Sequence, residues 1–313
     1  MNNTVESPWG LHSRVHRLNN FPHEFGDCYV KRDDELACGI SGTKLRKYAS
    51  LVPALLAKGI ERLVIIAGTN SNNLLSALQI ARENQWQVTT FLLKPWSYES
   101  NGNFKLSQMF LKEQDIKWVE REDWHRVEEL AQQYITEQNE QCFLLTEGAS
   151  VKEAMPGAES LAYDIICNEK TVGLQFDHIF IDSGTGFSAI ALIKAMYALK
   201  HPAMIHVLLL ADDEKLFKQK MQKLLSGCDF SHNSSTKYHC FYPSNAKSFG
   251  AVNATVKKEI KRMAYDEGIL VDPIYSAKLF YEARRKIVAD NLPGNKLIIH
   301  SGGVLSLAFM SYS

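Results

Sequence analysis

Short apolar runs that alternate with segments of helical periodicity constrain the fold of this chain more than any other feature. Residues 62–68 form a nearly continuous run, Arg-Leu-Val-Ile-Ile-Ala-Gly, which is typical of a strand buried on both faces of a parallel sheet. Polar residues follow, and apolar side chains then recur every three or four positions through residues 74–84, as in a helix. Similar apolar runs stand at 28–32, 88–93, 142–145, 178–182, 204–210 and 296–300. The alternation predicts an α/β fold of parallel or mixed sheets with flanking helices.

Four segments fit this alternation less well. Residues 1–27 are mixed in character and are expected to form an irregular arm. Residues 106–112 are expected to form a short helix, and residues 269–271 a short strand. Residues 211–248 hold a charged helical segment and a polar stretch, and they are the part of the chain whose structure the sequence predicts least.

The composition is that of a soluble globular protein, with 45% hydrophobic and 22% charged residues. Lys plus Arg equals Asp plus Glu at 35 each, so no bulk charge would recruit nucleic acid or an anionic membrane. No apolar run approaches the roughly 18 residues of a membrane span, and residues 1–10 lack the pattern of a signal peptide. The six cysteines lack metal-type spacing, so we expect no metal site and a reducing, cytoplasmic location.

A glycine-rich turn follows the apolar run at 178–182. It consists of Ser183, Gly184, Thr185 and Gly186, and a segment of helical periodicity comes after it. Glycines let the backbone approach an anion closely, and the N–H groups of a helix N-terminus point toward that anion. The spacing matches neither the dinucleotide motif nor the nucleoside-triphosphate loop, and it suits a single phosphate group. A plain tight turn is the alternative, and the motif alone leaves both interpretations open.

A second polar turn, Gly68-Thr69-Asn70-Ser71-Asn72-Asn73, follows the apolar run at 62–68. Short polar side chains cap helix N-termini well, which is the simpler explanation of this turn. Four consecutive such residues exceed what one cap needs, and ligands of open α/β sheets bind at the carboxyl ends of the strands. Ser71, Asn72 and Asn73 are therefore predicted to bind a substrate carboxylate.

Tyr275 and Ser276 come shortly after the run at 269–271. A tyrosine in such a place usually serves packing. A Tyr-Ser pair that faces two anion-binding turns is a candidate acid/base and hydrogen-bonding pair. His300, which precedes Ser301-Gly302-Gly303, is expected to support the site structurally rather than to act as a catalytic residue.

Lys44 stands in the stretch Ser41-Gly42-Thr43-Lys44-Leu45-Arg46-Lys47-Tyr48, between a Gly-Thr turn and a helical segment. Most lysines are solvated surface charges, but this framing would project Lys44 from a fixed backbone point. Like-charge repulsion from Arg46 and Lys47 is expected to lower the pKa of Lys44, and a lowered pKa favours imine formation. We therefore predict that Lys44 carries a covalently bound aldehyde cofactor.

These stretches together resemble the fold-type II family of pyridoxal-phosphate enzymes, in the branch that holds 1-aminocyclopropane-1-carboxylate deaminase and D-cysteine desulfhydrase. The family patterns Gly-Gly-Asn-Lys-x-Arg-Lys, Gly-x-x-Ser-Asn and Asp-Pro-Val-Tyr-x-Gly-Lys stand here at residues 41–47, 68–72 and 272–278. The resemblance runs from Tyr29 to the end of the chain, apart from residues 211–248. It implies a fold like that of the tryptophan synthase β subunit.

The resemblance implies roles for the matched residues. Lys44 would be the Schiff-base lysine of pyridoxal 5'-phosphate, Lys47 would assist at its phosphate, and Asn72 would hydrogen-bond its ring hydroxyl. Ser71 would act on the substrate as a nucleophile or proton-transfer residue, and Tyr275 would face the substrate. The residues that would hold the cofactor phosphate are Ser183, Gly184, Thr185 and Gly186. Ser276 would contact the pyridine nitrogen.

Position 276 distinguishes members of this branch, because the deaminases have a glutamate there and desulfhydrase-like members have a hydroxyl residue. Ser276 cannot serve as a carboxylate counter-ion, so a less protonated ring nitrogen is expected. That favours removal of the α-proton with loss of a good leaving group over opening of a cyclopropane ring. The chain also departs from the family pattern at Thr43, at Ala277, at Phe249 and in the connector 150–156.

We therefore expect a pyridoxal-phosphate lyase or hydrolase that acts on a small amino acid as D-cysteine desulfhydrase does, giving a 2-oxo acid, ammonia and sulfide. The alternatives are 1-aminocyclopropane-1-carboxylate deaminase, a fold-type II enzyme for an L-hydroxy amino acid, and a pyridoxal-phosphate-binding protein without turnover. The sequence does not identify the amino acid or its enantiomer. The resemblance implies a homodimer, with a larger domain of residues 1–47 and 161–313 and an inserted smaller domain of residues 48–160.

Overall fold

The computed structural model describes residues 9–36, 42–95, 102–226 and 237–310. They divide into two compact units, a smaller one built on Lys44–Gly157 and a larger one built on Leu11–Thr43 and Ala158–Leu307. The predicted smaller domain, 48–160, begins and ends a few residues later than this unit, and the predicted larger domain, 1–47 with 161–313, is displaced accordingly. The first limit differs because helix α1 (Lys44–Ala57) belongs as a whole to the smaller unit, where its Arg46 carbonyl lies against Gly157. A Cβ atom on Gly157 would approach that carbonyl oxygen to 1.9 Å, so this packing requires glycine.

The larger unit is built on a six-stranded sheet with the strand order β1-β2-β10-β7-β8-β9. Its strands are β1 (Val15–Arg17), β2 (Cys28–Arg32), β7 (His178–Ser183), β8 (Met204–Leu209), β9 (Tyr238–Phe241) and β10 (Lys296–His300). β1 is antiparallel to β2, and every other pairing in this sheet is parallel. His300 pairs with Arg32 at the carboxyl ends of β10 and β2, so residues that follow both strands emerge at the same edge.

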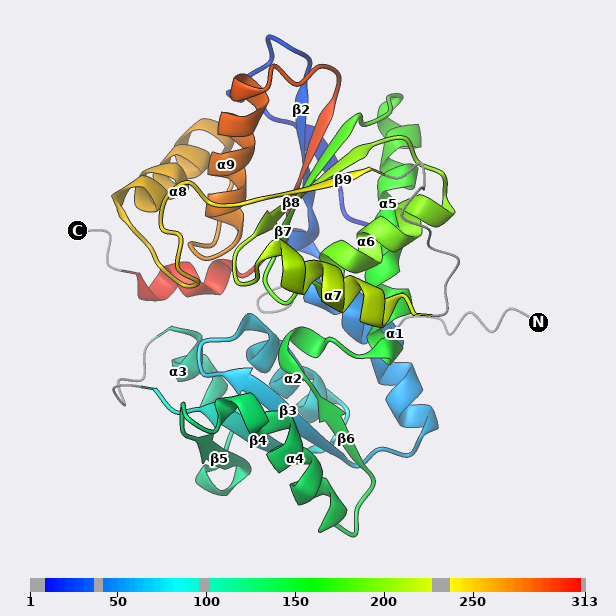
Figure 1. Cartoon of the computed structure of the whole chain (residues 1–313), viewed down its shortest axis with the longest axis vertical. Helices are drawn as coiled ribbons and strands as arrows, with labels where there is room; N and C mark the ends of the chain where they lie inside the picture. The colour runs from blue at the N-terminus through cyan, green and yellow to red at the C-terminus, as the bar shows by residue number, and fades with distance from the viewer. Residues whose placement is uncertain (1–8, 37–41, 96–101, 227–236, 311–313) are drawn as a thin grey trace. The chain divides into compact units, whose positions relative to one another are not determined.

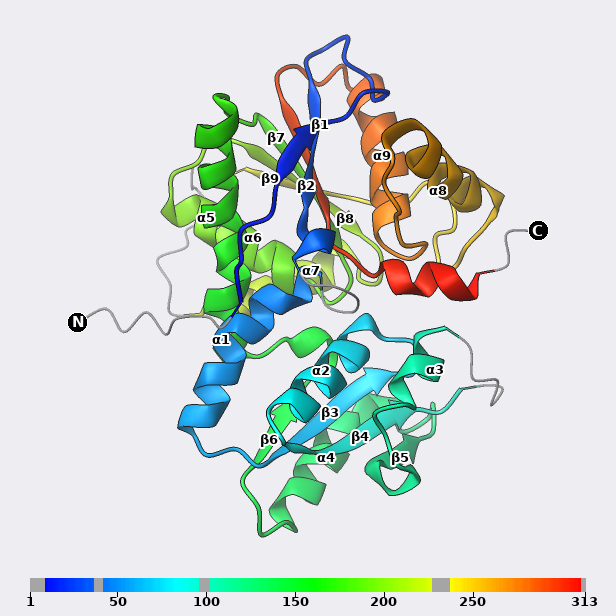
Figure 2. The ribbon, with the colours of Figure 1, turned by 180° about the vertical axis from the view of Figure 1, so that it is seen from behind.

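Helices cover both faces of this sheet (Figures 1 and 2). The helices α5 (Met155–Val172) and α6 (Phe187–Ala198) lie on one face, and α8 (Ala254–Glu267) and α9 (Ser276–Ala289) lie on the other. The helix α7 (Glu214–Leu224) packs Phe217 and Met221 into the core on the α5 and α6 side. Because successive strand residues point to opposite faces, Leu297 and Ile299 of β10 enter that core, and His300 points to the α9 side.

The smaller unit is built on a four-stranded parallel sheet with the order β5-β4-β3-β6. Its elements are β3 (Arg62–Gly68), α2 (Asn72–Glu83), β4 (Gln87–Leu93), α3 (Asn103–Ser107), β5 (Ile116–Val119), α4 (Val127–Thr136) and β6 (Cys142–Leu145), besides α1. Val64 and Ile66 pack against α4, and α2 also contacts β3. Helices therefore bury both faces of β3, which explains its continuous apolar run. The predicted α/β class, with one mixed and one parallel sheet, is confirmed.

The expected irregular arm and the expected helix 106–112 were wrong in detail. Residues 15–17 of the arm form the edge strand β1. The helix α3 begins at Asn103 and ends at Ser107, earlier than expected. The segment 211–248 contains α7 and β9, and its residues 227–236 lie outside the described part of the chain. None of the described helices is long and apolar enough to cross a membrane.

The predicted strand at 269–271 was also wrong. The Leu270 carbonyl accepts a hydrogen bond from His300 Nε2 at 2.7 Å. The Asp272 carboxylate accepts the backbone N–H groups of Ile274, Tyr275 and Ser276. The Ile269 N–H donates to the Met263 carbonyl of α8, so both hydrogen-bonded groups bind partners outside a sheet, and the segment connects α8 to α9 without strand pairing.

Candidate functional site

The turn at Ser183–Gly186 lies between the carboxyl end of β7 and the N-terminus of α6. Gly186 is the N-cap of α6 with φ of 90°, and no side chain of the described residues caps this helix. Ser183 is 3% exposed, and its Oγ has no hydrogen-bond partner among the described residues. A buried hydroxyl and uncapped helical N–H groups in one turn can bind an anion.

Tyr275 lies beside this turn. A Cβ atom on Gly184 would be 3.1 Å from Tyr275 Cε1 and 3.3 Å from its hydroxyl oxygen, so any other residue would crowd the ring. Phe249 packs edge-on against the Tyr275 ring, with centroids 5.9 Å apart. The structure therefore brings together the predicted phosphate turn and the predicted substrate-facing tyrosine.

Phe249 is held in place by its own segment of chain. Lys278 of α9 donates from Nζ to the Ala246 carbonyl at 2.8 Å, and burial lowers the pKa of Lys278. Glu282, one turn further along α9, accepts from both the backbone N–H and the hydroxyl of Ser244. Phe249 itself is 54% exposed and covers the outer side of Tyr275.

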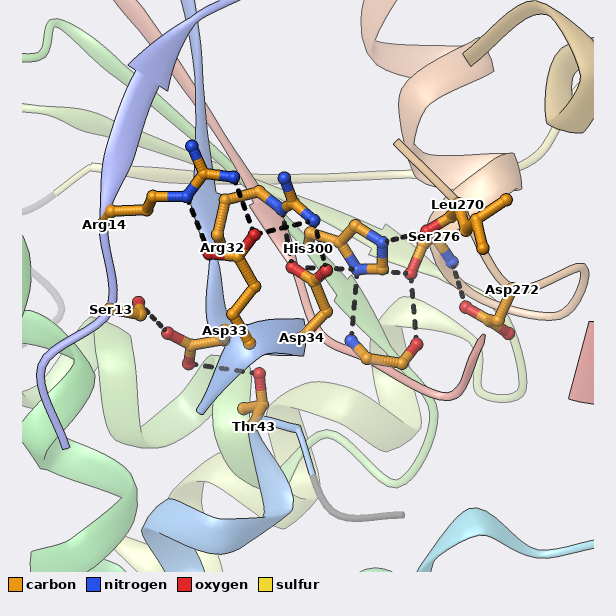
Figure 3. A network of polar contacts seen from close by, with 12 residues as sticks. Ser13, Arg14, Arg32, Asp33, Asp34, Thr43, Leu270, Asp272, Ser276 and His300 are labelled. Atoms are coloured by element: carbon orange, nitrogen blue, oxygen red, sulfur yellow. Dashed lines mark hydrogen bonds and ion pairs between the residues drawn. The ribbon is translucent and has the colours of Figure 1, made fainter. Parts of the chain in front are cut away.

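Ser276, the first residue of α9, is buried beside His300 (Figure 3). The Ser276 hydroxyl lies 3.3 Å from His300 Nδ1 and 3.5 Å from the Gly302 carbonyl oxygen. His300 Nε2 faces the Leu270 carbonyl, which can only accept, and Nδ1 receives the Gly302 N–H at 3.2 Å. These contacts assign the neutral tautomer of His300 with hydrogen on Nε2. The predicted supporting place of His300 agrees with this geometry.

Charged residues lie behind His300. Asp34 Oδ1 is 3.9 Å from His300 Nδ1, and the same carboxylate receives two hydrogen bonds from Arg32 at 2.9 and 2.7 Å (Figure 3). Arg32 also contacts Glu35 at 3.1 Å, and Glu35 pairs with Arg14. Each carboxylate of this chain of charges is therefore paired with a guanidinium.

The Gly-Thr turn before Lys44 packs against the same backbone. Gly42 has φ of 47°, and a Cβ atom there would lie 2.5 Å from the Ser301 carbonyl oxygen. The Thr43 N–H donates to that oxygen at 3.0 Å, and the Thr43 hydroxyl donates to the Asp33 carboxylate at 3.2 Å (Figure 3). The lead-in to Lys44 and the hydroxyl of Ser276 thus share the backbone of Ser301 and Gly302.

The smaller unit contains the other predicted residues. Lys44 is the first residue of α1 and is partly buried. Lys47 Nζ donates to the Gly148 carbonyl at 2.7 Å, inside this unit. The predicted cofactor roles of Lys44 and Lys47 remain predictions.

The three loop residues Ser71, Asn72 and Asn73 have different places. Ser71 caps α2, because its Oγ accepts the N–H groups of Asn73 and Leu74 at 3.1 and 3.3 Å. Asn73 is 2% exposed, and its Oδ1 accepts a hydrogen bond from Tyr48, whose pKa is raised by burial. Asn72 is partly exposed, and its Oδ1 accepts from Asn103 Nδ2 at 2.5 Å. The sequence analysis missed Asn103. The one local indication of its place is Gly102, which precedes it and stands at the N-cap of α3.

The fold and these turns define an α/β protein with an uncapped helix N-terminus at the carboxyl end of β7, among the parallel strands of the larger sheet. Residues 9–302 match the model of the family described as pyridoxal-phosphate dependent enzyme, and the chain belongs to this family. The resemblance predicted from the motifs, the fold-type II assignment and the cofactor pyridoxal phosphate are confirmed.

Relatives in the family carry two activities in their names. The chain is 26% identical over 318 residues to the mitochondrial bifunctional D-cysteine desulfhydrase/1-aminocyclopropane-1-carboxylate deaminase of Arabidopsis thaliana, covering 95% of this chain and 77% of that protein. It is 24% identical over 305 residues to a D-cysteine desulfhydrase of Salmonella paratyphi A, covering 93% and 90%. The crystal structure of an ACC deaminase homologue superimposes with a TM-score of 0.82 at 20% identity, covering 97% of this chain and 96% of that one.

The larger unit fits the phosphate of this cofactor. The unbonded hydroxyl of Ser183 and the uncapped N-terminus of α6 both offer hydrogen-bond donors to an anion. Gly184, the next residue of the turn, has no side chain to crowd the Tyr275 ring. The donor set therefore suits a phosphate group.

Proposed function

We propose that this chain catalyses the α,β-elimination of a small amino acid with a good leaving group, as D-cysteine desulfhydrase does. The chemistry around Ser276 carries the proposal. The Ser276 hydroxyl contacts neutral His300, while Asp272 accepts three backbone N–H groups and Asp34 pairs with Arg32. A ring nitrogen at Ser276 would meet an uncharged hydroxyl instead of a carboxylate. A less protonated ring withdraws electrons less strongly, which favours departure of a good leaving group over opening of a cyclopropane ring.

Pyridoxal phosphate supplies the electron sink when bound, and the residues of the chain do the remaining work. Lys44 would hold the cofactor and move the α-proton of the substrate. The loop of Ser71 and Asn72, which are partly exposed, would bind the substrate carboxylate, and Asn72 would also hydrogen-bond the ring hydroxyl of the cofactor. Buried Asn73 supports the loop through Tyr48. Tyr275 would donate a hydrogen bond to the leaving group beside the phosphate turn.

A comparison of two substrates tests the proposal. Purified protein reconstituted with pyridoxal phosphate is expected to release pyruvate and sulfide from D-cysteine faster than 2-oxobutyrate from 1-aminocyclopropane-1-carboxylate. Ser276→Glu should reduce that ratio, and Ser276→Thr, which keeps the hydroxyl, should preserve it. A higher rate with 1-aminocyclopropane-1-carboxylate would overturn the proposal in favour of the deaminase.

A panel of L- and D-amino acids separates the remaining alternatives. Turnover restricted to an L-hydroxy amino acid would replace D-cysteine as the substrate. Bound cofactor without product from any amino acid would indicate a binding protein without turnover.

We also propose that the chain works as a homodimer, as its resemblance to the family implies. Light scattering on the purified holoprotein is expected to give twice the chain mass of 35.4 kDa. A mass equal to one chain would contradict this.

A further inference from the structure

The N-terminus of the short helix α3 is bound to the loop that precedes α2. Gly102 has φ of 61°, and a Cβ atom there would lie 2.8 Å from Asn70 Oδ1. The Phe104 N–H donates to the same Oδ1 at 3.3 Å, and Asn103 Nδ2 donates to the Asn70 carbonyl at 3.3 Å. Three consecutive residues thus hold one side of the loop that carries Ser71 and Asn72.

These contacts also determine which way the Asn72 amide is turned. The Asn70 carbonyl can only accept, so the Asn103 atom beside it must be the NH2 group. That same NH2 group lies 2.5 Å from the Asn72 side chain, which must therefore present Oδ1 to it. The NH2 group of Asn72 is left pointing the other way, in a residue that is partly exposed.

Asn103 is a polar residue in a buried place. It is 3% exposed, and its own Oδ1 has no hydrogen-bond partner among the described residues. An unsatisfied buried acceptor is destabilising, whereas the NH2 group of the same amide makes both hydrogen bonds to the loop. The contacts of Asn103 thus serve the loop that carries Asn72.

We propose that Asn103 is a positioning residue that fixes the Asn72 amide so that its NH2 group is presented to an oxyanion, the ionised ring oxygen of the cofactor. The inference rests on the proposed function only in placing Asn72 at that oxygen. A hydrogen bond to an ionised oxygen is stronger than a neutral one, so the orientation of this amide determines part of the cofactor affinity.

Asn103→Asp tests the proposal, because a carboxylate of the same shape can only accept. The new carboxylate would attract the NH2 group of Asn72, and the Asn72 Oδ1 would then face the ring oxygen. Fluorescence titration of the apoprotein with pyridoxal 5'-phosphate is expected to show a dissociation constant raised by about tenfold or more. Asn103→Ala removes the donor without adding charge and is expected to raise the constant less.

The same titrations in an Asn72→Ala background show whether Asn103 acts through Asn72. There Asn103→Asp should change the dissociation constant by less than about twofold, since no amide is left to turn. Ser107→Ala removes the polar group of another buried residue of α3 and is the matched control, expected to leave the constant unchanged. An equal effect of Asn103→Asp in both backgrounds, or an effect of Ser107→Ala as large, would overturn the proposal.

These measurements need no turnover, so they are independent of the substrate. If D-cysteine gives no product but Asn103→Asp weakens binding only when Asn72 is present, the proposed reaction fails and the positioning role stands. If D-cysteine is turned over and the dissociation constant does not change in Asn103→Asp, the positioning role fails and the reaction stands.

Discussion

Two strand-to-helix turns with short polar residues, Gly68–Asn73 and Ser183–Gly186, occupy equivalent places in the two units. In the smaller unit Ser71 caps α2 and accepts two backbone N–H groups. In the larger unit Gly186 stands at the cap of α6 without a side chain, and the Ser183 hydroxyl has no partner among the described residues. A side chain thus caps one helix N-terminus, whereas no side chain of the described residues caps the other.

The difference shows that the same local pattern supports two kinds of site. At a capped terminus the side chain of the cap already engages the first N–H groups of the helix. A terminus whose N-cap residue is glycine has no capping side chain, and its backbone N–H groups are suited to bind a phosphate. The comparison supports our proposal that the turn of the larger unit binds the phosphate and that side chains in the turn of the smaller unit bind the substrate.

The largest expected effect concerns the covalent attachment that we predict at the start of α1. Lys44→Ala should abolish the visible absorbance of lysine-bound pyridoxal phosphate, because no other amine replaces this one. Mass spectrometry after borohydride reduction should find the cofactor on the Lys44 peptide of the native chain and on no peptide of the variant. Lys58→Ala, which removes an exposed lysine of the same helix region paired with Glu153, is the control and should keep the adduct.

The next prediction concerns how the free energy of unfolding depends on pH, which should differ between the two units. Burial, followed by the charge of nearby His178 and Lys286, lowers the pKa of His206 in the larger unit to about 3. Unfolded His206 binds a proton below about pH 6.5 and the folded residue does not, so the free energy of unfolding should fall as pH drops. Between pH 6.5 and 5 the loss should be about 2 kcal/mol in urea titrations.

His206→Gln should remove most of this pH dependence. His125→Gln is the matched control, because His125 is the one histidine of residues 44–157 and is exposed. An unchanged pH profile in His206→Gln would show that another group causes the acid sensitivity.

A smaller effect is expected from a single methyl group in each turn. Gly186→Ala places a Cβ atom at positive φ, 3.3 Å from the Phe217 ring, and should lower the free energy of unfolding by about 1–2 kcal/mol. Gly68→Ala in the other turn meets no atom within 4 Å and should have almost no effect in the same urea titration. Equal effects of the two substitutions would mean that the backbone of the 183–186 turn is not restrictive.

The smallest effects separate capping from ligand binding. Ser71→Ala removes the cap of α2 and should lower the free energy of unfolding by about 1 kcal/mol, whereas Ser71→Asn should retain the cap. Ser183→Ala removes a hydroxyl that has no partner among the described residues, so it should leave the free energy of unfolding unchanged. It should raise the dissociation constant of pyridoxal phosphate by about tenfold. The opposite pattern would exchange the roles of the two turns.

Much of the architecture could be predicted from local patterns. The continuous run at β3 could only be stabilised with helices on both faces, and the glycine-rich turn after β7 could be recognised by its residue types. The strand predicted at 269–271 was wrong because its backbone groups bind other partners, the Met263 carbonyl of α8 and the side chain of His300. Helix α3 was placed too late because five residues give too few turns for periodicity to mark the ends.

The sequence by itself determined the α/β class, the two polar turns and the motifs that indicate a pyridoxal-phosphate enzyme. These depend on residue type and on spacing within short segments. Only the tertiary structure decided that Ser71 caps its helix while the Ser183 hydroxyl has no partner in the described part of the chain. It also decided that Ser276 lies against a neutral His300 and that Asn103 sets the direction of Asn72. Each of these depends on which atom of a distant residue comes within hydrogen-bond reach, and spacing along the chain carries no information about that.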